Sequence, residues 1–341
     1  MQKSKLILVC LLAFLLESGS AQHRSLNLTV NGYGLSIGNS RRVNGIRLNF
    51  RDAYLERVNG LNLTIWKPKK PVTGTIKGLA LGLTITGAEK IYGLSLATLG
   101  IIGEESLQGV IVGPLGAGAG EDIAGIAIGG LGLGSGGDIS GIAIGGLGLG
   151  SGNDLKGIMI GGLGVGCGQD MSGLVIGGLG LGCGGNLTGI GLALIGAGAG
   201  EKVNGLFIAG IGVGAGDNVT GVMVGGVGVG CGGMLRGLAI GGVGVGAPTV
   251  EGIVLAGLAA GAKDFTGLAI APAYFKIEKG GLMRGVSVSA VNLNKGEQQG
   301  LSIGLFNFAK FLNGIQLGVL NYAKNNPKWL RLLPVLNLHF E

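Results

Sequence analysis

The stretch Gly125-Ile-Ala-Ile-Gly-Gly-Leu-Gly-Leu-Gly-Ser-Gly-Gly-Asp-Ile-Ser140 is one copy of a sixteen-residue unit that repeats along the chain. Numbered from its leading glycine, the unit has apolar residues at positions 2, 4, 7, 9 and 15, a small residue at position 11 and mostly polar residues at position 14. The leading glycines that keep the sixteen-residue spacing are Gly109, Gly125, Gly141, Gly157, Gly173, Gly189, Gly205, Gly221 and Gly237. A fixed period of this length indicates a repeat architecture.

Glycine accounts for 78 of the 341 residues, yet 47% of the chain is hydrophobic and only 7 residues are proline. Collagen is excluded because no Gly-X-Y period is present, and a disordered chain would lack these apolar residues. Interior glycines disfavour helices, and apolar residues alternate with small ones at positions 2 and 4 and again at 7 and 9. The composition and spacing therefore predict an all-β protein.

The repeat continues on both sides with units of fourteen to eighteen residues. The outer units begin at Gly45, Gly60, Gly78 and Gly93, and at Gly252, Gly267, Gly285, Gly300 and Gly314. Their first ten positions keep the pattern, and the length changes fall in the polar tail. Strand segments followed by a surface turn vary in this way.

The alternation changes phase at the Gly-Gly pair of positions 5 and 6, and two architectures explain this. In a parallel β-solenoid the pair turns a corner, so that bulky residues point inward and Gly or Ala point outward. In an antiparallel meander, or an outer-membrane β-barrel with one strand per repeat, the pair forms a bulge. We favour the solenoid with coils of 14–18 residues, because loops of alternating length and a polar lumen, which a barrel requires, are both absent from the sequence.

Asn292, Asn307 and Asn321 share position 8 of three successive C-terminal units. In a solenoid they would stack and bond side chain to side chain along the ladder. The alternative is that they are ordinary turn or surface asparagines.

Residues 1–21 have the pattern of a secretory signal peptide. Lys3 and Lys5 precede an apolar run from residue 6 to 16, and small residues place the cleavage after Ala21. No later segment has eighteen uninterrupted apolar residues, so no transmembrane helix is expected. The cysteines that remain are Cys167, Cys183 and Cys231.

Charge divides the exported chain into three parts. A basic N-terminal cap with irregular repeats spans 22–77, with ten Lys or Arg against two acids, and C-terminal repeats with a cap span 276–341, with eight against three. The glycine-rich body 78–275, whose most regular units cover 109–236, carries five against twelve. The basic ends could contact cell-envelope glycan or lipid headgroups, whereas export argues against nucleic acid.

The sequence predicts no catalytic, cofactor-binding or metal site. His23 and His339 lack partners for a triad or a zinc site, and the Gly-x-Gly runs lack the Gly-Lys-Ser/Thr and βαβ context of nucleotide loops. The turn at 134–139 has a faint similarity to calcium nonapeptide repeats, but its period is wrong. We expect Asp and Asn at position 14 to cap tight turns through their own backbone.

Two further groups of residues have a structural and a functional interpretation. Cys167 and Cys183 hold the same position in adjacent units, so they could form a disulfide, but Ser and Ala replace them elsewhere, which favours small packing residues. The segment from Trp66 to Lys70, with Lys67 and Lys69, and the region around Trp329 are candidate glycan contacts. The structural interpretation is that Trp66 covers the first coils as a cap.

The segment Gly-Ile-Gln-Leu-Gly-Val-Leu-Asn-Tyr-Ala (314–323) and the ending at 333–340 resemble the "GxQxGxxN" repeats of exported bacterial surface-repeat proteins, most closely over residues 285–341. The resemblance implies a Gram-negative cell-surface or outer-membrane location and no enzymatic activity. We therefore expect a non-enzymatic structural or adhesive surface protein. The alternatives are a pore or anchor in the outer membrane and a glycan-binding protein.

Overall fold

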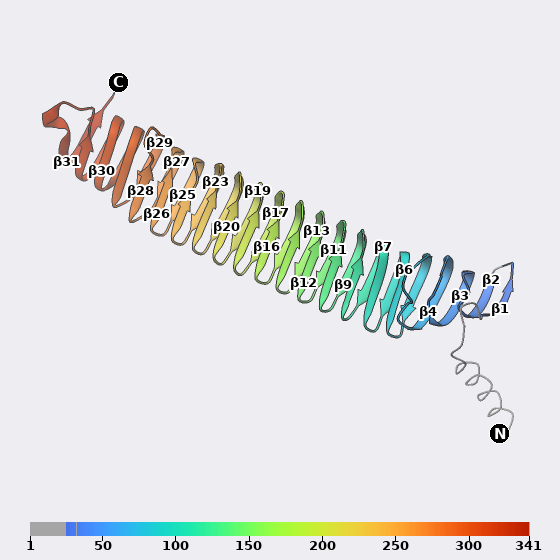
Figure 1. The fold of residues 1–341 in the computed structure, drawn as a ribbon. Coiled ribbons are helices and arrows are strands. Elements are labelled where there is room, and N and C mark those ends of the chain that lie inside the picture. The colour runs from blue at the N-terminus through green and yellow to red at the C-terminus, as the bar shows by residue number, and fades with distance from the viewer. Residues whose placement is uncertain (1–24, 32, 341) are drawn as a thin grey trace. The chain divides into compact units, whose positions relative to one another are not determined.

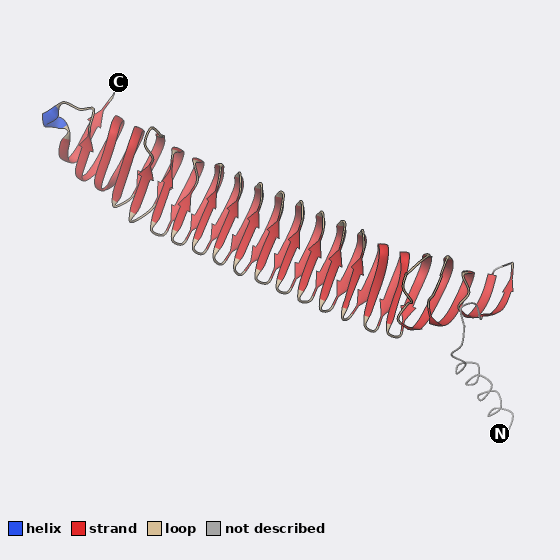
Figure 2. Cartoon of the chain, in the orientation of Figure 1, coloured by secondary structure: helices blue, strands red, loops and turns tan. Residues whose placement is uncertain are grey.

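The computed structural model describes residues 25–340 except residue 32. The predicted signal peptide, residues 1–21, lies outside the described residues. The chain forms two compact units that divide after Gly130, and each is a parallel β-solenoid whose coils stack one on the next (Figures 1 and 2).

In the unit that begins at Leu131, each regular coil contains one long and one short strand. The long strands are β11 (Ile139–Gly145), β13 (Leu155–Gly161), β15 (Met171–Gly177), β17 (Leu187–Ala193), β19 (Val203–Ala209), β21 (Val219–Gly225), β23 (Met234–Gly241), β25 (Thr249–Ala256), β27 (Asp264–Ile270) and β29 (Leu282–Val288). The short strands are β10 (Gly132–Ser135), β12 (Gly148–Ser151), β14 (Gly164–Cys167), β16 (Gly180–Cys183), β18 (Gly196–Ala199), β20 (Gly212–Ala215), β22 (Gly228–Cys231), β24 (Gly244–Gly246), β26 (Ala259–Ala262) and β28 (Tyr274–Ile277). The unit ends with β30 (Val291–Ala323), the short 3₁₀ helix η1 (Lys328–Leu330) and β31 (Leu332–His339).

Equivalent strands of successive coils pair in parallel with equivalent residues opposite one another. Strand β13 pairs with β15 so that Gly157 lies beside Gly173, and β14 pairs with β16 so that Cys167 lies beside Cys183. Strand β13 ends at Gly161 and β14 begins at Gly164, so the Gly-Gly pair of this coil turns a corner. The predicted solenoid is confirmed, and the antiparallel arrangement is wrong.

The first unit is built in the same way from β1 (Ser25–Val30), β2 (Tyr33–Gly38), β3 (Arg42–Arg51), β4 (Arg57–Trp66), β5 (Thr75–Gly82), β6 (Ile85–Ala97), β7 (Gly100–Gly113), β8 (Gly116–Ala119) and β9 (Ile123–Gly129). Its strands pair in parallel from β2 onward, and β1 pairs antiparallel with β2. In the second unit, β31 likewise pairs antiparallel with β30. The antiparallel strand β1 thus covers the edge of β2, and the antiparallel strand β31 covers the edge of β30.

The leading glycine of each coil is required by the backbone. Gly205 has φ +126°, a conformation that L side chains rarely adopt, and a Cβ there would lie 2.0 Å from the carbonyl oxygen of Gly189 in the preceding coil. The same close approach recurs at the second corner glycine, where a Cβ on Gly178 would lie 1.7 Å from the Gly162 oxygen. These glycines allow neighbouring coils to stack at strand spacing.

The interior differs from the prediction at three of the five apolar positions. Positions 9 and 15 point inward as predicted; Leu181 and Leu187 are buried examples. Positions 2, 4 and 7 point outward instead, and the side chain of position 3, which lies between positions 2 and 4 in the strand, points into the interior. The physical reason is that one continuous strand runs from position 15 to position 5, and side chains alternate along it. Once position 15 faces inward, positions 2 and 4 must face outward.

The interior becomes polar toward the outer coils. In the second unit, Asn292 donates to Asn307 and Asn307 donates to Asn321, each at 2.7 Å, and all three side chains are buried. The predicted asparagine ladder is confirmed, and the surface alternative is wrong. Asn292 lies in register with the buried Phe275, so the ladder continues the interior row of position 9.

Candidate interaction surface

Positions 2 and 4 form an outward surface of the second unit, which we call the aliphatic face. It spans the twelve coils that begin with Gly141 to Gly314, and every one of its residues is Ile, Leu or Val. Its members are Ile142, Ile144, Ile158, Ile160, Leu174, Ile176, Ile190, Leu192, Leu206, Ile208, Val222, Val224, Leu238, Ile240, Ile253, Leu255, Leu268, Ile270, Val286, Val288, Leu301, Ile303, Ile315 and Leu317. The more exposed residues at position 2 keep 36% to 47% of their surface open to solvent, as at Leu174 and Ile190.

A second apolar row follows the corner at position 7, and we call it the corner row. From Leu147 to Leu258 it contains only Leu, Ile and Val, and these side chains are 45% to 53% exposed. The corner places each of them beyond the end of the long strand, with the short strand on its other side. Corner row and aliphatic face are therefore neighbouring parts of one apolar surface.

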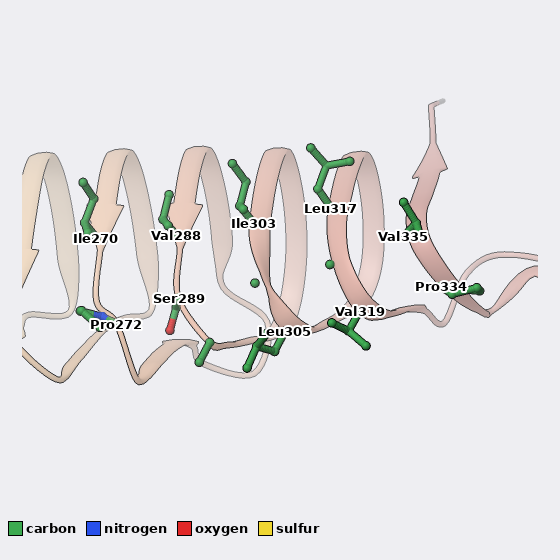
Figure 3. A pocket seen from close by; sticks show the side chains of 13 residues that line it. Ile270, Pro272, Val288, Ser289, Ile303, Leu305, Leu317, Val319, Pro334 and Val335 are labelled. Atoms are coloured by element: carbon green, nitrogen blue, oxygen red, sulfur yellow. The ribbon is translucent and has the colours of Figure 1, made fainter.

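Toward the C-terminal end this surface is hollowed into an apolar groove of about 930 Å³ (Figure 3). Ile270, Val288, Ile303 and Leu317 form one wall, one residue from each of four successive coils, and Pro272, Leu305 and Val319 are on the corner side. Pro334 and Val335 close the groove where β31 covers the last coil. Its lining contains a single polar side chain, Ser289.

Position 3, which lies between the two rows of the aliphatic face but points inward, is far less uniform. In the second unit it holds Ala, Met, Val, Gly, Phe, Ser and Gln, all of them in the interior. In the first unit, taken by itself, position 3 includes the fully buried Arg47 and Asn62, while its own positions 2 and 4 are again all aliphatic from Ile46 to Ile128. The outward positions are thus more strictly apolar than the inward one.

The buried Arg47 is held by a closed polar cluster. It forms an ion pair with Asp52 and donates to Asn62 at 2.7 Å and to Asn39 at 2.9 Å, while its Nε donates to the Ser40 carbonyl at 3.0 Å. Buried charges need such partners. Since all three nitrogens of the guanidinium donate within the cluster, it serves the fold.

The short strands present positions 8 and 10 outward, and in the regular coils both are glycine. A Cβ on Gly182 would have no heavy atom within 4 Å, and one on Gly134 would make an ordinary contact at 3.9 Å. These residues also lack the positive φ of the leading glycines. The folded chain thus gives no steric reason for glycine at Gly182 or Gly134, whereas a Cβ on Gly228 would lie 3.1 Å from the Gly244 oxygen, a tight contact.

The turn at positions 12–14 is the polar edge of the coil. Asp170 donates its backbone N–H to Asp154 Oδ1 at 3.0 Å, and Asn186 donates its N–H to Asp170 Oδ1 at 2.7 Å. The expectation that these side chains cap their own turn is wrong, because each carboxylate accepts from the equivalent residue of the next coil. The Lys156 ammonium and the Asp170 N–H lower the pKa of Asp154, since both stabilise its charged form.

The predicted cysteine pair lies together, as its register requires. Cys167 and Cys183 are thiols, as is Cys231, and all three are partly buried. The hydrogen bond between the first two raises the pKa of Cys167 and lowers that of Cys183. Burial raises the pKa of Cys231.

The other candidate residues do not converge on one site. Trp66 is 48% exposed at the end of β4, Lys69 lies over the ring of Tyr54 at 5.6 Å, and Trp329 is 78% exposed in η1 of the other unit. His339 bonds Asn326 at 2.6 Å. Over residues 25–340, leaving out residue 32, no three His, Cys, Asp or Glu side chains gather as a metal ion would need.

Comparison with known protein families, with curated proteins and with solved structures finds no match to this chain. The resemblance to bacterial surface-repeat proteins therefore remains a prediction. Among the described residues, none of the helical segments has the length and apolar character needed to cross a bilayer.

The sequence pattern contained the signal for the aliphatic face. Reading the alternation without interruption from position 15 through the leading glycine to position 5 places positions 2 and 4 on the side opposite to position 15. Sorting residues by bulk alone places them inside, which the structure contradicts.

Proposed function

We propose that this chain is an exported, non-enzymatic surface protein with a structural and adhesive role, attaching to other matter through its apolar surface. The observation that carries the proposal is the aliphatic face: all of its outward residues are Ile, Leu or Val. Soluble monomers rarely expose a contiguous apolar patch larger than a few hundred Å², and larger patches mark interaction sites. The predicted signal peptide and the resemblance to surface-repeat proteins support export to a bacterial cell surface.

The repeat suits a structural role because each coil is held by its neighbours through backbone hydrogen bonds and presents the same outward residues. Attachment can then be distributed over many equivalent weak contacts. An enzyme instead needs a small set of polar groups that converge on one place. The surface described above is uniform and apolar.

Adhesion of the purified chain to methyl-terminated and hydroxyl-terminated monolayers on a quartz-crystal microbalance tests this function. We expect retention on the methyl surface and little on the hydroxyl surface. Leu163→Asp with Leu179→Asp, in the corner row, should abolish retention, whereas Ser172→Asp with Thr188→Asp, outside the apolar surface, should preserve it. Equal retention of the two double variants, or none of the parent chain, would reject the adhesive role. A fusion of residues 1–21 to a reporter that is active only after export tests the location separately.

A further inference from the structure

The apolar surface of the second unit continues around the coil. The aliphatic face is the outside of the long strands, the corner row follows, and the glycine positions 8 and 10 are the outside of the short strands. The two sheets face each other through the interior, since a Cβ on Gly191 in β17 would lie 2.9 Å from Leu181 Cδ1 in β16. The apolar surface therefore covers the corner and both sheets that meet there, and one flat partner could cover only a part of it.

The dimensions of this surface fit a lipid leaflet. From position 2 to position 7 the chain makes five residue steps, which span at most ~17 Å at the rise of a strand. The hydrocarbon region of one leaflet is about 15 Å deep, half of a core of ~30 Å. Along the stack, twelve coils at ~4.8 Å give a face about 50 Å long, and hence a projected area on the order of 800 Å².

The backbone of the corner is suited to an apolar medium. Gly210, Ile211 and Gly212 are successive corner residues, and all three donate their N–H groups to carbonyls of the preceding coil, at 3.2, 2.7 and 3.1 Å. Irregular backbone without such partners is not tolerated in hydrocarbon, because no water replaces the missing hydrogen bonds. Burial of the corner in hydrocarbon would therefore leave none of these three N–H donors without a hydrogen-bond acceptor.

Charge is absent from the aliphatic face and the corner row, and in the short strands of the second unit it enters only at the C-terminal end, at Lys276 in β28. No residue of the aliphatic face or of the corner row is charged. Position 16, which borders the aliphatic face on the side away from the corner, carries Lys156, Arg236 and Arg284 against one carboxylate, Glu251. Arg236 pairs with Glu251 at 2.7 Å and Lys156 pairs with Asp154 at 2.8 Å, and these exposed pairs lie at the border of the apolar surface. Basic groups at this level are complementary to lipid phosphates.

We propose that the second unit lies corner-first in one leaflet of a lipid membrane, with the acyl chains covering the aliphatic face and the corner row. This inference rests on the proposed adhesive function and names its target. The coils contribute equivalent segments of one immersed surface, and the polar edge faces water. The strict Ile, Leu and Val content of positions 2 and 4 follows, because a fluid hydrocarbon phase contacts every coil in the same way.

The experiment compares two fluorophore positions on one coil of the full chain, in a background with all four cysteines replaced by serine. An environment-sensitive dye is attached to Ile195→Cys, in the corner row, or to Glu201→Cys, on the polar edge. The vesicles contain phosphatidylcholine and phosphatidylglycerol at about 4:1, with or without lipid that carries a nitroxide in the middle of its acyl chain. We expect the protein to float with the vesicles, and the Ile195→Cys dye to shift to the blue and be quenched severalfold more than the Glu201→Cys dye.

Two kinds of result would overturn the proposal. The first is a protein that does not float, or one whose two dye positions are quenched equally. The second is a two-chain species that buries the Ile195→Cys dye without lipid and persists with vesicles, which would identify a second copy as the occupant. Circular dichroism of both labelled chains confirms that they are folded. If flotation fails while retention on methyl monolayers persists, lipid is the wrong target and the adhesive function stands; if both fail, the function itself is rejected.

Discussion

Replacement of a leading glycine by alanine should separate the glycines that the fold requires from those that it does not. In Gly205→Ala the new methyl group would lie 2.0 Å from the Gly189 carbonyl oxygen, at a backbone φ of +126°. Backbone strain of this kind amounts to about 1–3 kcal/mol. Moving the neighbouring strand aside adds about 1–3 kcal/mol more, as in an overpacked core. We therefore expect Gly205→Ala to lower the free energy of unfolding by about 3 kcal/mol or more.

The matched control is Gly182→Ala in a short strand. Its methyl group meets no heavy atom within 4 Å, and its backbone is in a region open to alanine. Because alanine reduces the entropy of the unfolded chain, this variant should be more stable than the parent by about 0.4–1 kcal/mol. The same substitution thus has opposite effects at two glycines that lie two coils apart.

Urea unfolding followed by far-ultraviolet circular dichroism measures both variants against the parent chain. Hydrogen exchange adds the location of the effect, since a repeat protein transmits a local defect chiefly to adjacent coils. Protection should fall in β17, β19 and β21 of Gly205→Ala and stay unchanged in Gly182→Ala. A Gly205→Ala chain within about 0.5 kcal/mol of the parent would refute the assigned role of the leading glycine, because that is the range of neutral surface changes.

Three further outcomes are expected. Phe207→Ala should lower the free energy of unfolding by about 3–5 kcal/mol in urea, because the side chain is fully buried. Gly191→Ala should also lower it in the parent chain but less so in Phe207→Ala, since the new Cβ would lie 2.4 Å from the Phe207 ring. A double-mutant cycle without coupling would contradict this contact. Asn307→Ala should destabilise by about 2–3 kcal/mol, because it removes both ladder hydrogen bonds and leaves the buried Asn321 Oδ1 without the Asn307 donor. An unchanged urea midpoint would argue against the ladder. As pH rises, iodoacetamide should modify Cys183 before Cys167 in peptide mass spectra, because the lowered pKa of Cys183 yields its thiolate at lower pH. In Cys183→Ser, Cys167 should react at lower pH than it does in the parent chain. Modification of Cys167 before Cys183 in the parent would contradict the hydrogen-bonded pair.

Much of the architecture could be predicted because one period controls it. A fixed spacing of sixteen residues places Cys167 beside Cys183, and any parallel stack then pairs the remaining residues in the same register. The Gly-Gly corner followed from the change of phase, and the asparagine ladder followed from identical residues at one position. These predictions required only that like positions stack.

The direction of individual side chains was harder to predict, because hydrophobicity alone gives the wrong result here. Ile158 and Ile160 are bulkier than most of the residues that point inward at position 3, so burial of the largest apolar residues favours them for the core. The buried Leu155 determines the direction of both side chains. It occupies position 15 of the same strand, and side chains point alternately inward and outward from it. The position 14 carboxylates show a second limit, because they accept from the backbone N–H of the next coil, a contact that the sequence of one turn does not reveal.

The contrast between the inside and the outside of the coil favours an external apolar partner. In a protein surrounded only by water, the interior selects apolar side chains and the exterior is free to vary. In this chain, position 3 accepts Gly191, Phe207 and Gln316 in the interior, whereas positions 2 and 4 on the outside admit only Ile, Leu and Val over the same coils. Contacts between outward residues that lie opposite one another, such as Ile158 and Leu174, add to coil stacking. Such contacts do not by themselves require an aliphatic residue in every coil, since Thr pairs also stabilise neighbouring strands. A medium or partner that contacts each coil of the second unit from outside, as we propose, accounts for the restriction in all twelve coils.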